Sequence, residues 1–212
     1  MTKTRHARRF LEEKNKVKVT MMFRGRQVAH PELGQAVLDR VSSELRRNPN
    51  ADLSNYVLLH GASYPADLGY RDELNRLVAE NKLRYWGTVS RPKEAPDWKG
   101  DCGRVEGFFS GDRLDDLEKR LGLAPGGFNP KNVVVYICGL TGTISGTVIP
   151  LIDRGFVPDF KRIREALGVP ADIKDSVFYE QYDTEPVINI KDESIVAPLR
   201  ERMQAALAKP LP

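Results

Sequence analysis

Three apolar runs in this chain end in residues that suit a phosphate or a nucleotide. They close at His60-Gly61, at Ser90-Arg91 and at Cys138-Gly139. A strand that ends in a glycine turn presents backbone N–H groups at the edge of a parallel sheet where nucleotides bind. A second arginine, Arg104, follows in the run CGR. One hydroxyl and two guanidinium groups are the chemistry expected of a site for a ribose 2′-phosphate.

Each of these residues also has an ordinary structural interpretation. Arg91 could be a surface arginine at a strand-to-loop turn, and Arg104 could pair with Glu106 or Asp101. Cys138 could be a buried strand cysteine with no chemical role. For each of these residues, the residue types alone leave open both a nucleotide-binding role and an ordinary structural role.

The positive charge of the chain is concentrated near its N-terminus. Residues 1–50 contain 12 Lys and Arg against 5 Asp and Glu, whereas the other residues contain 21 against 24, and the net charge is +4. Such an asymmetry favours a phosphate or nucleic-acid partner for the first part, although a solvated basic helix face would give the same composition. No apolar run approaches the ~18 residues of a membrane span, so no membrane partner is expected.

The two cysteines, Cys102 and Cys138, are far apart and lack a CxxC spacing. Neither a structural disulfide nor a metal site is expected, and a reducing compartment is the default. The N-terminus lacks the apolar region of a secretory signal. These features together predict a cytoplasmic protein.

Apolar strands alternate with helices along the chain, which favours a parallel sheet covered on both faces. The predicted strands are 16–23, 56–60, 83–90, 133–138 and 176–182. The predicted helices are 4–14, 31–47, 67–81, 112–121, 143–154, 160–167 and 194–207, with a long loop over 94–111. The fold class that this predicts is an α/β three-layer sandwich with a mostly parallel, doubly wound, Rossmann-like sheet of about five strands.

Residues 55–190 resemble the NADP-binding domain of ferredoxin–NADP⁺ reductases from its second strand onward. The runs VLLHGASYPADLGYRDEL, TVSR, CGR, VYICG and FYEQYDTEPV carry the resemblance in order. It implies that Ser90, Arg91 and Arg104 hold the 2′-phosphate of NADP(H). It also implies that Cys138-Gly139 approaches the nicotinamide. Gly61 is a further cofactor-binding candidate because of its place at the end of an apolar strand. Thr141-Gly142-Thr143 stands where the family often has a proline, so this loop departs from the pattern.

Two parts of the reductase pattern are not expected in this chain. They are the flavin-binding barrel and the first strand with its glycine-rich pyrophosphate loop, whose backbone reaches the phosphates at a helix N-terminus. Hydride transfer needs an acceptor held against the nicotinamide. The expectation is therefore weak NADP(H) binding, no FAD and no catalytic residues; an active chain would be an NADP-dependent reductase.

Residues 4–45 resemble part of the C-terminal domain of bacterial translation initiation factor 3. The runs RHARRFLEE, KVKVTMMFRGRQ and AHPELGQAVLDRV carry this resemblance. Family members bind small-subunit ribosomal RNA through basic side chains. The resemblance implies six RNA-binding candidates here: Arg5, Arg8, Arg9, Arg24, Arg26 and Arg40.

The two resemblances predict an artificial or recombined chimera. Residues 1–48 would supply a strand and a helix to the truncated segment 49–212, giving one composite domain. The strand 16–23 would lie beside both 56–60 and 133–138, although its alternating Lys and Val suit a half-exposed strand. The expected function is a chimeric domain with residual dinucleotide binding. Alternatives are an RNA-binding module and a reductase, in a monomer or a swapped dimer.

Overall fold

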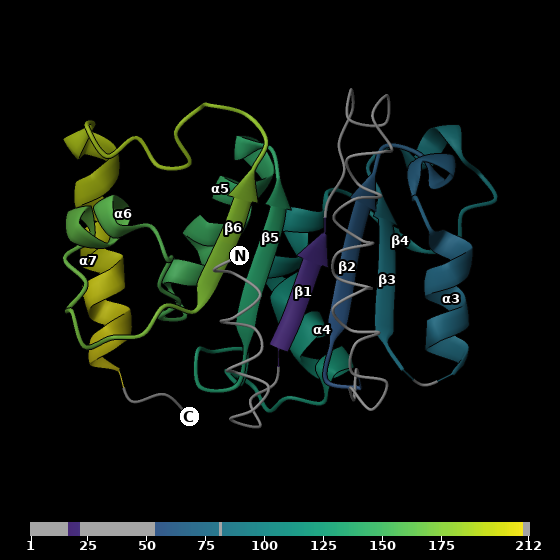
Figure 1. Ribbon diagram of the computed structural model, residues 1–212, viewed down its shortest axis with the longest axis horizontal. Coiled ribbons are helices and arrows are strands. Elements are labelled where there is room, and N and C mark those ends of the chain that lie inside the picture. The colour runs from purple at the N-terminus through teal and green to yellow at the C-terminus, as the bar shows by residue number, and fades with distance from the viewer. Residues whose placement is uncertain (1–16, 22–53, 81, 210–212) are drawn as a thin grey trace, which may run out of the picture. The chain divides into compact units, whose positions relative to one another are not determined.

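The computed structural model describes residues 17–21, 54–80 and 82–209 (Figure 1). The chain divides into two compact units. The first unit comprises Met1–Lys18 and Glu106–Pro212, and the second unit comprises Val19–Val105. The helices predicted over 4–14 and 31–47 lie outside the described residues.

The second unit contains a three-stranded parallel sheet. Its order is β2-β3-β4, with β2 at Val57–Ala62, β3 at Arg84–Val89 and β4 at Asp101–Cys102. All six residues of β2 are buried, as expected of an apolar strand covered on both faces. The helical segments of this unit are η2 at Pro65–Asp67, α3 at Arg71–Ala79 and η3 at Pro92–Glu94.

Two small apolar clusters hold these elements together. Leu58 of β2 packs with Leu74 of α3, and Tyr85 lies against both. Near the other end of the strands, Ala62 and Val89 pack with Leu68, and Trp98 covers them. The Trp98 indole nitrogen donates a 2.9 Å hydrogen bond to the carbonyl of Asp101, which satisfies the polar atom of this half-buried ring.

The first unit contains β5 and β6, two strands of a second sheet whose order is β1-β5-β6. Strand β1 is Val17–Met21, β5 is Val134–Gly139 and β6 is Val177–Gln181; β5 and β6 are parallel. The helices of the unit are α4 at Asp112–Leu121, α5 at Thr141–Ile152, α6 at Lys161–Ala166 and α7 at Glu193–Ala208. A 3-10 segment, η4, spans Val105–Phe109. Strand β1 is the neighbour of β5 (Figure 1), which is one of the two neighbours expected for the strand 16–23.

Buried aromatic rings form part of the core of the first unit. Phe128 lies between Phe109 and Phe156, with ring centroids 6.0 and 5.5 Å away. Local sequence sets the helix ends around this core. Gly122 ends α4 with a left-handed φ of 68°, and Asp192 accepts a hydrogen bond from the backbone N–H of Ser194 to begin α7.

The α/β class and the parallel strand pairing are confirmed. The strands form two three-stranded sheets rather than one sheet of about five strands. Within the described residues, β1 and β2 are not hydrogen-bonded neighbours. The helix predicted over 67–81 begins only at Arg71, because Tyr70 before it has a left-handed φ of 58°. The loop predicted over 94–111 contains β4 and η4. The composite domain divided at residue 48 stays a prediction.

Candidate functional site

The three parallel strands of the second unit end in register, so their carboxyl ends together form one edge of the sheet. Ala62 of β2 pairs with Val89 of β3, and Val89 pairs with Cys102 of β4. The residues that follow these pairs include Ser90, Arg91 and Arg104. The sheet therefore brings together, at one edge, three residues that the sequence predicts to bind a 2′-phosphate.

Backbone hydrogen bonds continue the register past the strand ends. The N–H groups of Ser90 and Arg91 donate to the carbonyls of Ala62 and Ser63, at 2.9 and 3.1 Å. The N–H of Gly103 donates to Val89 at 2.8 Å, and the Thr88 hydroxyl donates to the Gly103 carbonyl at 2.8 Å. These bonds fix the turns that carry Arg91 and Arg104, both of which are exposed.

The Arg91 guanidinium belongs to a short hydrogen-bonded chain with Tyr64 and Glu94. Arg91 Nη1 donates to the Tyr64 hydroxyl at 2.6 Å, and this hydroxyl donates to Glu94 Oε2 at 2.9 Å. The guanidinium carbon also lies 5.4 Å from the centre of the Tyr64 ring, within range of a cation–π interaction. The hydrogen bond to Tyr64 and the nearby Glu94 raise the pKa of Arg91, so its charge is retained.

Gly61 has a packing role in this arrangement. It is buried, and a Cβ added to it would lie 2.7 Å from Val105 Cγ1 and 2.8 Å from Val105 Cβ. The glycine lets Val105 approach the backbone of β2. A contact between Gly61 and a nucleotide stays a prediction.

The first unit has its own candidate strand end, at Cys138-Gly139 of β5. Cys138 pairs in register with Glu180 of β6, and the N–H of Tyr182 donates to the Gly139 carbonyl at 3.0 Å. Tyr182 is 36% exposed. Burial is the main cause that raises the pKa of Tyr182, and Cys138 and Glu180 add to the effect. A thiol, a phenol and a carboxylate therefore lie together at this strand end.

A carboxylate of the chain occupies the N-terminus of α5. Both oxygens of Asp183 accept from the backbone N–H of Thr141, at 3.2 and 3.0 Å, and Oδ1 accepts from the Thr141 hydroxyl at 2.5 Å. Gln181 donates to the same oxygen at 2.8 Å. These hydrogen bonds, with that of the Thr141 hydroxyl first, lower the pKa of Asp183. Asp183 supplies the negative charge that a helix N-terminus favours.

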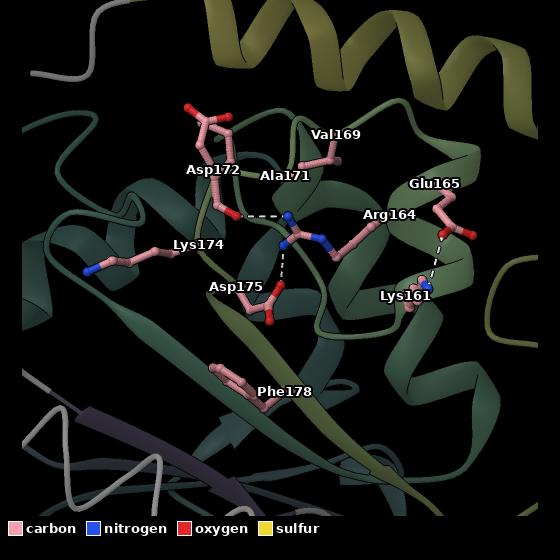
Figure 2. A pocket seen from close by; sticks show the side chains of 10 residues that line it. Lys161, Arg164, Glu165, Val169, Ala171, Asp172, Lys174, Asp175 and Phe178 are labelled. Atoms are coloured by element: carbon pink, nitrogen blue, oxygen red, sulfur yellow. Dashed lines mark hydrogen bonds and ion pairs between the residues drawn. The ribbon is translucent and has the colours of Figure 1, made fainter.

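A cavity of about 510 Å³ also lies in the first unit, where α6 and the following loop face Phe178 (Figure 2). Arg164 extends into it but is held by its own surroundings. Its guanidinium donates to the Asp175 carboxylate and to the carbonyls of Pro170 and Ile173, at 3.1 and 2.8 Å for the carbonyls. Arg164 therefore fastens the loop and has a structural role.

The described residues contain no group of three His, Cys, Asp or Glu side chains arranged for a metal ion. The same part of the chain has no helix with the length and apolar character needed to cross a membrane. Arg5, Arg8, Arg9, Arg24, Arg26 and Arg40, the RNA-binding candidates, lie outside the described residues.

Sequence reasoning missed four residues at these two strand ends: Tyr64, Glu94, Tyr182 and Asp183. Tyr64 follows β2 as Arg91 follows β3, so the rule that parallel strands end at one edge could have indicated it. Asp183 follows β6 in the same way. Glu94 carries no such signal, because a turn of 3-10 helix brings it back toward Tyr64.

Two family models match the chain. The oxidoreductase NAD-binding domain matches residues 33–148, which is more than half of the chain. The C-terminal domain of translation initiation factor IF-3 matches residues 1–55. Both expected resemblances are therefore confirmed, and the two matches share residues 33–55.

Curated relatives match the N-terminal segment. Translation initiation factor IF-3 of Thermus thermophilus is 62% identical over 45 residues, which are 21% of this chain and 26% of that protein. The factor of Deinococcus radiodurans is 64% identical over 44 residues, 21% of each chain. This chain thus spans about a quarter or less of the length of these relatives.

Among solved structures, a ferredoxin NADP⁺ reductase from Neisseria gonorrhoeae with bound FAD and NADP superposes with a TM-score of 0.50. The sequence identity is 21%, and the match covers 79% of this chain and 56% of that one. The likeness shows the fold. Because that reductase contains FAD, the likeness gives no support to the expectation that FAD does not bind.

Proposed function

Because the chain belongs to the oxidoreductase NAD-binding domain family, we propose that the edge formed by Ser90, Arg91 and Arg104 binds the 2′-phosphate of an NADP(H)-type nucleotide. The register that joins Ala62, Val89 and Cys102 carries this proposal, because it brings the three residues to one edge of one sheet. A carboxyl edge of parallel strands is where nucleotides bind in doubly wound folds.

The chemistry of the edge suits a phosphate dianion. Arg91 and Arg104 are exposed cations, and Ser90 adds an exposed hydroxyl donor. Arginine presents a planar set of donors that matches phosphate oxygens, and charge-assisted hydrogen bonds are about twice as strong as neutral ones. The Tyr64 ring beside Arg91 adds a flat surface of the kind that stacks on arginine and on heterocyclic rings.

For the first unit, the proposal concerns the end of β5. Family membership makes Cys138 and Gly139 the candidate contacts of the nicotinamide, and the partly exposed Tyr182 ring beside them supports that role. The nicotinamide would supply hydride chemistry when bound. Cys138, Gly139 and Tyr182 would hold the nicotinamide ring at the end of β5, with the Cys138 thiol and the Tyr182 hydroxyl close to each other.

Binding of two adenosine phosphates tests the proposal in the second unit. Isothermal titration calorimetry should show tighter binding of 2′,5′-ADP than of 5′-AMP. Arg91→Ala should weaken 2′,5′-ADP about tenfold or more and leave 5′-AMP nearly unchanged, because a charge-assisted pair is lost. The control Lys93→Ala removes a neighbouring exposed cation. Equal affinity for both ligands in the unsubstituted protein, or equal losses in both variants, would contradict the proposal.

A second candidate function is RNA binding by the N-terminal segment. It is favoured by the 62% identity to a translation initiation factor over 45 residues. Affinity for a small-subunit ribosomal RNA fragment should fall steeply as salt rises, because neutralised phosphates release counterions. Replacing Arg24 and Arg26 together by Ala should reduce both the affinity and the salt slope. An unchanged slope in that variant counts against this candidate.

A further inference from the structure

We propose that Glu94 opposes the 2′-phosphate at Arg91, so that this edge favours NADP(H)-type over NAD(H)-type nucleotides less than it would without the Glu94 charge. The inference rests on the proposed function. It assigns a specificity-determining role to a residue outside the set that the sequence predicted for phosphate binding.

The carboxylate of Glu94 lies close to the Arg91 guanidinium. Arg91 Nη1 and Glu94 Oε2 are hydrogen-bonded to the same oxygen, the Tyr64 hydroxyl, at 2.6 and 2.9 Å. The carboxylate therefore lies no farther from the guanidinium than the length of two successive hydrogen bonds. Any anion that binds Arg91 therefore lies close to the negative charge of the Glu94 carboxylate.

Without a ligand, Arg91 is already hydrogen-bonded within the protein. Its guanidinium already donates to Tyr64, and Glu94 compensates part of its charge through this hydroxyl. A 2′-phosphate has to share or replace that hydrogen bond. It must also approach Glu94, which is exposed and whose carboxylate accepts the hydrogen bond from the Tyr64 hydroxyl. Both effects reduce the gain in affinity that a second phosphate group brings.

A nucleotide that lacks the 2′-phosphate would meet a different group at this edge. In dinucleotide-binding folds, an acidic side chain accepts a hydrogen bond from the ribose 2′-hydroxyl, whereas an arginine accommodates the 2′-phosphate. The network of Tyr64, Arg91 and Glu94 contains both kinds of group. A free 2′-hydroxyl meets an acceptor at this edge, while a 2′-phosphate meets a cation and an opposing anion.

Glu94→Gln separates the charge of this residue from its geometry. The amide oxygen can still accept from the Tyr64 hydroxyl, so Tyr64 and Arg91 keep their places. Only the negative charge is removed. The matched control is Glu73→Gln on α3, which removes the charge of another exposed carboxylate of the same unit, paired with Arg76 at 3.6 Å.

The experiment is calorimetric titration of the full chain and both variants with 2′,5′-ADP and with 5′-AMP. Glu94→Gln should raise the affinity for 2′,5′-ADP by about three- to tenfold, because it removes an exposed negative charge that repels the 2′-phosphate dianion. The affinity for 5′-AMP should stay unchanged or become weaker. Glu73→Gln should change neither ligand. The gain in Glu94→Gln should shrink at high salt.

The outcomes separate this inference from the proposed function. If the unsubstituted protein prefers 2′,5′-ADP but the preference is the same in Glu94→Gln, Glu94 only orients Arg91 and the inference is overturned. If the unsubstituted protein shows no preference and Glu94→Gln acquires one, the inference is supported and the proposed function of the natural sequence fails. If neither protein shows a preference, both are overturned.

Discussion

The Arg91 guanidinium donates a 2.6 Å hydrogen bond to the hydroxyl of Tyr64. This bond joins residues that follow two adjacent parallel strands, β2 and β3. It places a cation and an aromatic ring at the edge of the sheet where a nucleotide is expected. The site is therefore built by strand register, with side chains that are far apart in the sequence.

Gly61→Ala should destabilise the protein through packing. The added methyl group would lie 2.7 Å from Val105 Cγ1, and such overpacking costs about 1–3 kcal/mol. Val105→Gly removes both side-chain atoms that the added methyl group would meet, so the double variant Gly61→Ala/Val105→Gly should be more stable than the sum of the two single changes predicts. Urea denaturation measures each free energy of unfolding. Strict additivity would contradict the packing role.

The same double variant also tests whether Gly61 contacts the nucleotide. If Gly61 acts only through Val105, the double variant should bind 2′,5′-ADP with the affinity of the unsubstituted protein. A loss of binding in a stably folded double variant would instead restore Gly61 as a ligand contact.

Glu118→Ala should be strongly destabilising. The Glu118 side chain is only 4% exposed, and its carboxylate accepts from the N–H groups of Gly126 and Phe128, both at 3.0 Å, and from Arg154 at 3.1 Å. Losing these partners should cost about 3 kcal/mol in the free energy of unfolding. The control Asp116→Ala removes a carboxylate from the exposed pair with Arg120 and should cost less than about 0.5 kcal/mol. Similar losses in both variants would contradict this account.

Stability should decrease as the pH is lowered toward 4, because of His60. Burial lowers the pKa of His60 from 6.5 to about 4 in the folded protein. Between these values the unfolded chain binds a proton that the folded protein does not, so the folded state loses stability as the pH falls. The contribution should be about 2 kcal/mol between pH 7 and pH 5. Urea denaturation of His60→Gln should lack this part of the pH dependence, and an unchanged slope would contradict it.

Asp183→Asn should lower the melting temperature at neutral pH. The carboxylate accepts hydrogen bonds from the N–H and the hydroxyl of Thr141 at the start of α5, and an amide cannot accept all of them. The folded pKa of Asp183 is depressed below 3.8. Its stabilisation is thus present above that value and is lost as the pH falls through the folded pKa.

The comparison of melting temperatures should therefore depend on pH. The difference between Asp183→Asn and the unsubstituted protein should narrow as the medium becomes strongly acidic. Asp172→Asn, on an exposed loop, is the matched control. Its melting temperature should equal that of the unsubstituted protein at both neutral and strongly acidic pH. A constant difference for Asp183→Asn would mean that its charge is not involved.

Sequence patterns were sufficient where local signals agreed. The helix 112–121 was predicted with the observed bounds, since acidic residues begin it and Gly122 ends it. The strand β4 was missed because two residues, Asp101 and Cys102, contain no periodicity. Its pairing with Val89 is what brings Arg104 to the site, and that register depends on tertiary structure.

The candidate site was predictable only in part. Ser90, Arg91 and Arg104 were recognisable by their chemistry and by the order of motifs. Their neighbours Tyr64 and Glu94 were not, because contacts of Tyr64 with residues 27 and 30 positions away arise from the pairing of β2 with β3. The division of the strands into two sheets likewise depends on which strands are hydrogen-bonded to each other, and the periodicity of the sequence does not specify that pairing.

Chemical-shift mapping with 2′,5′-ADP tests the central claim most directly. In ¹H–¹⁵N spectra of the full chain, the account predicts saturable shifts of the amides of Ser63, Tyr64, Ser90, Arg91 and Arg104, and larger shifts than 5′-AMP causes. The amides around the cavity of Arg164 should not move. Shifts at that cavity in place of the strand ends, or identical shifts with both ligands, would contradict the account.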